Sequence, residues 1–228
     1  IKDDRYVAVM GGGYGTQFEG VGNALFLIDL EDITLPGSVE KVIEVEDSLA
    51  SDIVNSTPGT TVVVTPDTAR GLNFTGALVY LNDFEGKITK FNLTNMATDN
   101  SGKKIDLYDN TTLFWAGSTK SNGRYMYHSM DAAIGGTTNS LWLYAGTGDY
   151  ERIADRSSGV QNLLLGIKDE NYPFYKDVDG ATEPTPAKDM SDLTECKNVT
   201  KDTSGANCPQ SADCLLYTSP SPRDSDSS

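Results

Sequence analysis

The feature that most constrains the fold of this sequence is residues 75–94, TGALVYLNDFEGKITKFNLT. The first half, residues 77–81, is apolar, and the next five residues, NDFEG, are turn formers that end in glycine. Residues 87–93 then alternate between two sets of side chains, as a strand does when successive residues point to opposite faces of a sheet. The stretch therefore predicts a β-hairpin.

The same pattern of strand, turn and strand occurs on both sides of this hairpin. Residues 6–10 and 24–30 flank a GGGYG turn, and residues 141–145 and 162–167 flank GTGDYE. Further strands are expected at residues 39–46, 61–65, 104–109 and 124–135. Repeated units of short antiparallel strands are typical of β-propellers.

Three such units do not close a ring, because each blade of a propeller needs a neighbour on both sides. We therefore expect residues 1–171 to form an all-β fold, an incomplete or partial β-propeller of about three blades, each a four-stranded antiparallel sheet. The chain is interpreted as a fragment of a larger propeller. The hairpin register predicts that the following side chains are buried: Leu27, Val79, Leu81, Phe91, Trp142 and Leu164.

Charge and hydropathy exclude two kinds of partner. The chain has 33 acidic and 18 basic residues, which gives a formal charge of −15 and a pI near 4.3. Binding a phosphate backbone needs clustered Lys and Arg, so no nucleic-acid partner is expected. No apolar run approaches the roughly 18 residues of a membrane helix, so no membrane span is expected in this chain.

The last part of the chain has a different character. Residues 172–213 are rich in Pro, Asp, Thr and Lys and are expected to form a polar loop or a disordered segment. Residues 214–224, CLLYTSPSPRD, resemble the conceptual translation of a transposase-type sequencing adapter. Residues 214–228 are therefore interpreted as a non-native tail that makes few contacts with the β body.

Few residues of the sequence suggest catalysis. His128 is the only histidine, and its place beside Tyr125 and Tyr127 favours a structural role over a catalytic triad. The GGGYG stretch lacks the Lys-Ser or Lys-Thr of a phosphate loop and is expected to be a turn that needs positive φ. We therefore expect no catalytic and no cofactor-binding residues, and a binding function rather than an enzyme.

Two groups of residues suggest a metal ion. Asp177, Asp179 and Glu183 match part of a calcium loop, although the full pattern is absent, so a calcium ion is one interpretation and a solvated loop is the other. The acidic side chains at 149, 151 and 155 either meet a cation or are solvated.

Cys196 and Cys208 lie twelve positions apart in the polar segment. They form a candidate disulfide if the compartment is oxidising, and two reduced thiols otherwise. A zinc site is not expected, because two sulfurs and one distant histidine do not supply four ligands.

Three motifs together resemble one family. LNDFEGKITKFNL at 81–93, MGGGYG with GNALFLIDLED at 10–15 and 22–32, and YAGTGDYERIAD with QNLLLGIKDE at 144–155 and 161–170 are similar in order and spacing to segments of type IV pilus biogenesis proteins of the pilus-tip adhesin class. Quinoprotein-type propellers share the first motif, so the resemblance also implies quinoprotein-like repeats. The chain departs from the family pattern at Thr89 and Asn82, where tryptophan and glycine are usual, and it lacks the Asp-rich calcium loop before the hairpin.

The resemblance implies a C-terminal β-propeller on a secreted protein at the pilus tip of a Gram-negative bacterium, in the extracellular space or on the cell surface. It implies roles in pilus assembly, twitching motility and adhesion, with pilin subunits or minor pilins and a host or abiotic surface as partners. The alternative is a fragment of a pyrroloquinoline-quinone-dependent dehydrogenase, and a carbohydrate-binding propeller is a third hypothesis. Because propeller loops carry function, residues 11–22, 95–103 and 146–159 are expected to face partners.

Overall fold

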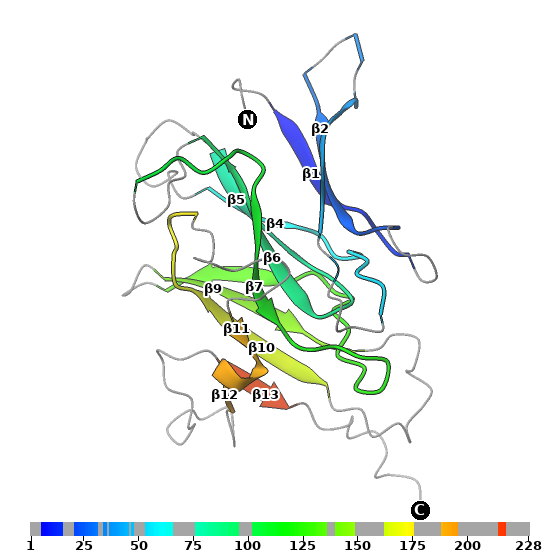
Figure 1. Ribbon diagram of the computed structural model, residues 1–228, viewed down its shortest axis with the longest axis vertical. Helices are drawn as coiled ribbons and strands as arrows, with labels where there is room; N and C mark the ends of the chain where they lie inside the picture. The colour runs from blue at the N-terminus through cyan, green and yellow to red at the C-terminus, as the bar shows by residue number, and fades with distance from the viewer. Residues whose placement is uncertain are drawn as a thin grey trace, which may run out of the picture.

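The computed structural model describes most of the first 175 residues and two short segments after them. The described residues are 6–15, 21–31, 34–35, 37–45, 47, 53–65, 76–95, 102–135, 140–148, 162–175 and 188–195, together with the backbone of 214–217. These residues form three β-sheets that follow one another along the long axis of the molecule (Figure 1). The only helix among them is a short 3-10 turn, η2 (Met190–Asp192).

The first sheet is an antiparallel meander of three strands. It consists of β1 (Val7–Gly11), β2 (Ala24–Asp29) and β3 (Val39–Glu44), in the order β1-β2-β3. The strands β1 and β2 flank the GGGYG turn as predicted, with Val7 opposite Asp29 and Gly11 opposite Leu25. This unit has three strands where four are expected of a blade.

The middle sheet contains the predicted hairpin. Its strands are β4 (Val62–Val64), β5 (Gly76–Asn82), β6 (Lys87–Thr94) and β7 (Asn110–Trp115), and β11 (Lys188–Asp189) pairs in parallel with β7 at the edge. The antiparallel hairpin β5–β6 runs from Gly76 opposite Thr94 to Asn82 opposite Ile88. Gly86 closes its turn at a φ of 73°, a conformation that L side chains rarely adopt.

The third sheet also has five strands, in the order β12-β13-β10-β9-β8. Its antiparallel part consists of β8 (Asp131–Ile134), β9 (Leu141–Gly146), β10 (Leu163–Asp169) and β13 (Cys214–Tyr217). The two-residue strand β12 (Thr194–Glu195) pairs in parallel with β13.

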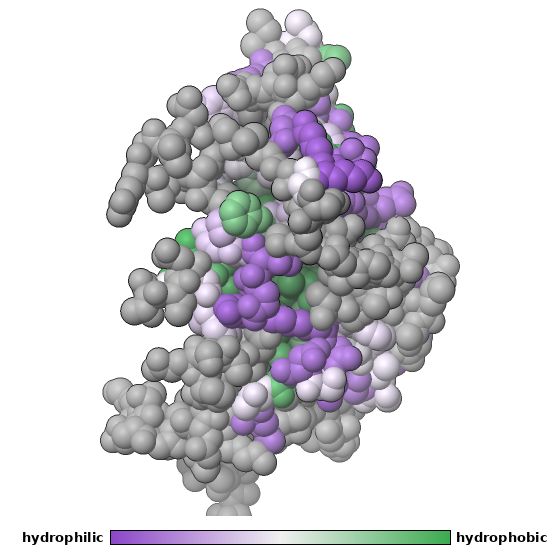
Figure 2. Space-filling view, turned by 60° about the vertical axis from the view of Figure 1, so that its left-hand side comes forward, coloured by the Kyte–Doolittle hydropathy of each residue, from purple (hydrophilic) through white to green (hydrophobic). Residues whose placement is uncertain are grey.

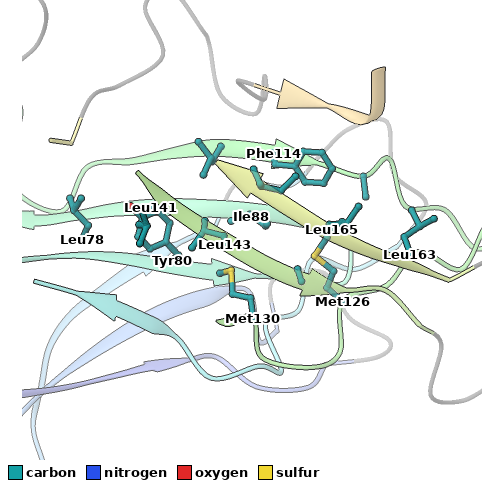
Figure 3. Packing of buried hydrophobic residues seen from close by; sticks show 14 of the residues in the cluster. Leu78, Tyr80, Ile88, Phe114, Met126, Met130, Leu141, Leu143, Leu163 and Leu165 are labelled. Carbon is teal, nitrogen blue, oxygen red and sulfur yellow. The ribbon is translucent and has the colours of Figure 1, made fainter. Parts of the chain in front are cut away.

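Two hydrophobic cores hold the three sheets together. Side chains of β2 and β3 pack against one face of β5 and β6, where Leu25, Val79 and Phe91 are buried. Side chains of β9 and β10 pack against the other face of the middle sheet, where Tyr80 and Phe114 are buried (Figure 3). The hairpin β5–β6 is therefore covered on both faces, and its strands are buried along almost their whole length.

Four of the six predicted core positions are confirmed, since Leu27, Val79, Leu81 and Phe91 are buried. The prediction for Leu164 is wrong, because its side chain is 46% exposed while Leu163 and Leu165 on either side are buried. Trp142 is only partly buried. Three leucines in a row do not reveal which of them faces the core, and a shift of one residue reverses the face of every side chain in a strand.

Two predicted strands differ from the structure. Residues 104–109 were expected to form the fourth strand of the middle unit, but residues 107–108 form a turn, in which Tyr108 has a φ of 73°, and β7 begins at Asn110. Of the expected strand at 124–135, only β8 is extended and paired. The fourth strand of the middle sheet therefore lies later in the sequence than its alternating pattern indicated.

The expectations for the last part of the chain are corrected at two places. Residues 188–195 form β11, η2 and β12 rather than an unstructured loop. The expectation of few contacts between the tail and the β body is wrong for Cys214–Tyr217, which pairs antiparallel with Leu163–Gly166 of β10. An edge strand presents unpaired N–H and C=O groups to any extended segment, so this pairing does not require a sequence selected to pack there.

Figure 2 shows, among the described residues on the face that it presents, hydrophilic side chains with hydrophobic ones set between them. Among the described residues, no helix is long and apolar enough to cross a membrane.

Candidate functional site

Segments from all three sheets meet at the turn of the β5–β6 hairpin, residues 83–86. The backbone N–H of Phe84 donates to the carbonyl of Ser56, at 2.9 Å. Ser56 and Thr57 in turn hold the loop that follows β1, because Gly12 N–H donates to Thr57 Oγ1 at 2.8 Å and Gly15 N–H donates to Ser56 Oγ at 3.1 Å. The GGGYG loop is thus fixed against the hairpin turn, and the expected positive φ is present at Gly13 (91°).

The segment that precedes β8 is fixed to the same turn. The buried side-chain amide of Asn82 donates to two of its carbonyls, Met126 O at 3.2 Å and His128 O at 2.9 Å. On the other side of this segment, Gly148 N–H donates to Tyr125 O at 2.8 Å. The departure from glycine at position 82 therefore supplies the amide that joins the middle and third sheets.

Four aromatic rings gather where these segments meet. Phe84 lies in the middle, with its ring centroid 5.3 Å from Tyr14, 6.2 Å from Tyr125 and 4.4 Å from Tyr127. Tyr14 and Tyr127 are stacked at 6.1 Å with 30° between their planes. We call Tyr14, Phe84, Tyr125 and Tyr127 the aromatic cluster; Phe84 is buried, whereas Tyr14 is 50% exposed.

Buried charges lie beside the aromatic cluster, on the two residues that flank Phe84 and on Lys87 at the start of β6. Lys87 Nζ is 2.6 Å from Glu85 Oε2 and 3.5 Å from Asp83 Oδ2, and all three side chains are almost fully buried. Burial raises the pKa of Asp83 to about 6, against the attraction of Lys87. Burial acts to lower the pKa of Lys87, but the charges of Asp83 and Glu85 outweigh it, so the pKa of Lys87 is raised.

A second buried ion pair joins the middle sheet to the third. Lys90 Nζ on β6 is 2.6 Å from Asp169 Oδ2 at the end of β10, and their side chains are 1% and 0% exposed. The hydroxyl of Tyr80 also donates to Asp169 Oδ2, at 2.6 Å, and Lys90 Nζ donates to Phe174 O at 2.9 Å. Burial lowers the pKa of Lys90 more than Asp169 raises it. Burial and the neighbouring Asp169 charge both raise the pKa of Tyr80.

This second cluster holds the fold together. Lys90 also lies 5.9 Å from the ring centroid of Tyr80 and 5.7 Å from that of Tyr175, which places the ammonium between two aromatic faces. Lys90 Nζ and both carboxylate oxygens of Asp169 therefore have partners, since Asp169 Oδ1 accepts from the backbone N–H of Asn171 at 3.0 Å.

The residues that the sequence singled out for metal binding or a disulfide lie outside the described residues. They are Asp177, Asp179 and Glu183, the acidic residues 149, 151 and 155, and Cys196 with Cys208. Most of the expected partner-facing loops at 95–103 and 146–159 also lie outside them. His128 is described and exposed. Within the described ranges, no group of three or more His, Cys, Asp and Glu side chains could hold a metal ion.

Sequence reasoning missed the aromatic cluster and both buried charge clusters. Tyr14, Phe84 and Tyr127 are far apart in the sequence, so only the folded chain brings them together. A weak signal for Lys90 was present, because a lysine between Ile88 and Phe91 in a strand covered on both faces has no route to solvent. That signal depends on knowing that the hairpin is covered on both faces.

Comparison with known proteins finds a similarity among solved structures. No protein-family model matches the chain, and no curated protein sequence matches it. Among solved structures, the C-terminal domain of PilY1 from Pseudomonas aeruginosa is similar, with a TM-score of 0.55 and 16% sequence identity. The match covers 92% of this chain and 47% of that one, so this chain spans about half the length of the structure that it resembles. At this identity the similarity concerns the fold.

Proposed function

We propose that this chain belongs to a non-enzymatic, type IV pilus-associated protein that acts in pilus assembly, twitching motility and surface attachment. The observation that carries the proposal is the similarity in fold to the PilY1 C-terminal domain over 92% of the chain. The three ordered motifs of the sequence point to the same family. Neither the similarity in fold nor the set of motifs depends on the identity of one residue.

The proposed architecture is part of a β-propeller. Each sheet is built mainly from strands consecutive in sequence, and each packs face to face on the next through its own hydrophobic core. Consecutive sheets stacked in this way are what neighbouring blades of a propeller require. In this proposal residues 1–171 contribute about three blades of a larger ring.

The proposed partners follow from the pilus assignment. They are pilin subunits or minor pilins on one side and a host or abiotic surface on the other, with the protein outside the cell or on the surface of a Gram-negative bacterium. The charged clusters of the described residues support a binding role over catalysis, because Lys90 is held by Asp169 and Lys87 by Glu85. A catalytic general base, by contrast, must lie within hydrogen-bond distance of a reacting group.

The proposal is tested by deleting the gene that encodes this protein and scoring piliation, twitching and attachment. In parallel, the purified full-length protein is assayed for quinone-linked alcohol and sugar oxidation with pyrroloquinoline quinone and calcium supplied. We expect loss of pilus display or attachment and no cofactor-dependent turnover. Turnover together with normal piliation would reject the proposal and favour the dehydrogenase.

A further inference from the structure

We propose that the aromatic cluster binds a neutral carbohydrate, with a sugar ring stacked on its exposed tyrosine surface. This inference goes beyond the pilus assignment and does not depend on it, because it concerns a binding site on the chain itself. It uses two sequence features, the GGGYG loop and the aromatic stretch around His128.

The packing of the rings determines where a ligand must lie. The centroid distances of 4.4 to 6.3 Å are those of rings in direct contact, so no space remains between them for a cation, as there would be in an aromatic cage. A ligand must therefore lie on the outside of the cluster. Phe84 is buried beneath, and Tyr14, at 50% exposure, together with the partly exposed Tyr125 and Tyr127, provides the outer surface.

The tyrosines are held in place before any ligand arrives. Tyr14 lies in the loop that Ser56 and Thr57 fix by hydrogen bonds, and Tyr127 lies between the two carbonyls that Asn82 holds. A surface ordered in this way loses little conformational entropy on binding, which favours a ligand that makes few contacts.

The charges around the cluster favour an uncharged ligand. Lys87 pairs with both Asp83 and Glu85, and Arg124, which precedes Tyr125 in the sequence, donates from its Nη1 to Ala116 O at 3.1 Å, so the formal charges of these four residues sum to zero. The overall charge of −15 disfavours polyanions. A neutral pyranose has an apolar C–H face that packs on an aromatic ring.

The test is a titration of the purified full chain with two neutral probes, N-acetyllactosamine and cellotetraose, followed by saturation-transfer NMR and calorimetry. We expect at least one probe to bind. Tyr14→Ala should then weaken binding roughly three- to tenfold, which corresponds to the loss of one aromatic contact. Tyr14→Phe, which keeps the ring, should retain most of the affinity.

The matched control is Tyr144→Ala, since Tyr144 on β9 is 45% exposed and takes no part in the aromatic cluster. This variant should bind like the parent chain. Circular dichroism of each variant establishes that it is folded. Absence of binding by both neutral probes would overturn the proposal, and so would equal losses in Tyr14→Ala and Tyr144→Ala. Binding of a sialylated trisaccharide or a lysine-rich peptide in place of the neutral probes would overturn it as well.

Discussion

The ion pair between Lys90 and Asp169 is expected to be a main support of the contact between the middle and third sheets. Replacing Lys90 by methionine keeps most of the side-chain volume but removes the charge. Asp169 then keeps only the Tyr80 hydroxyl as a described partner for its Oδ2 atom, in a site where its side chain is 0% exposed. We therefore expect Lys90→Met to destabilise the protein strongly.

The size of the effect follows from the geometry. At 2.6 Å and an effective dielectric constant of about 20, the gross attraction of the pair is about 6 kcal/mol. Part of that attraction offsets the cost of burying the ammonium, which the variant no longer bears. Removing one partner of a buried pair typically costs about 3–5 kcal/mol, a large share of the roughly 5–15 kcal/mol by which domains are stable.

The assay is urea unfolding followed by tryptophan fluorescence. With a slope of about 2–3 kcal/mol per molar urea, the midpoint of Lys90→Met should fall by roughly 1–2.5 M. The double variant Lys90→Met/Asp169→Asn keeps an acceptor for Tyr80 but removes the unpaired charge, and it should recover much of the loss. Lys168→Met is the control, because Lys168 pairs with Glu170 at 2.9 Å near the surface and should cost less than about 1 kcal/mol. Equal losses in Lys90→Met and Lys168→Met, or no recovery in the double variant, would refute the reasoning.

Two further predictions concern the hairpin turn and the register of β10. The pKa of Asp83 rises from 3.8 to about 6 on folding, so the native state binds the carboxyl proton more tightly than the unfolded state does. Burial of the ionised carboxylate therefore destabilises the native state, in full above pH 6. Asp83→Asn should therefore be more stable than the parent by up to about 3 kcal/mol at pH 7.5, and the difference should vanish as the pH falls below about 4; a difference independent of pH contradicts this. In β10, Leu165→Ala should cost about 2–5 kcal/mol in urea unfolding because Leu165 is fully buried. Leu164→Ala should cost less than about 1 kcal/mol, and equal costs would contradict the register.

The sequence predicted the strands best where two local signals agreed. In the central hairpin, alternation and a glycine-ended turn coincide, and the observed β5 and β6 lie within the predicted residues 75–94. At 104–109 the alternation is similar, but the chain turns there, with Tyr108 at positive φ. Alternation alone does not reveal whether a segment finds a neighbouring strand, since pairing depends on residues distant in sequence.

The candidate site could not be predicted from local patterns. Tyr14, Phe84 and Tyr127 come from three separate segments, and no local pattern around any of them indicates a contact with the other two. Asn82 looked like a departure from a motif, whereas the structure shows that its amide donates to Met126 O and His128 O. Such contacts follow from the stacking of the sheets, which the sequence pattern does not specify.

The central claim is that this protein is associated with type IV pili, and the most direct measurement is its location. Pili sheared from cells that produce this protein are purified and probed with an antibody against this chain, beside the same fraction from a strain that lacks the major pilin. The account predicts that the protein is present in the sheared fraction and is lost from it when the pilin is absent. Retention of the protein in the cells, or its presence in the sheared fraction without pilin, would contradict the account.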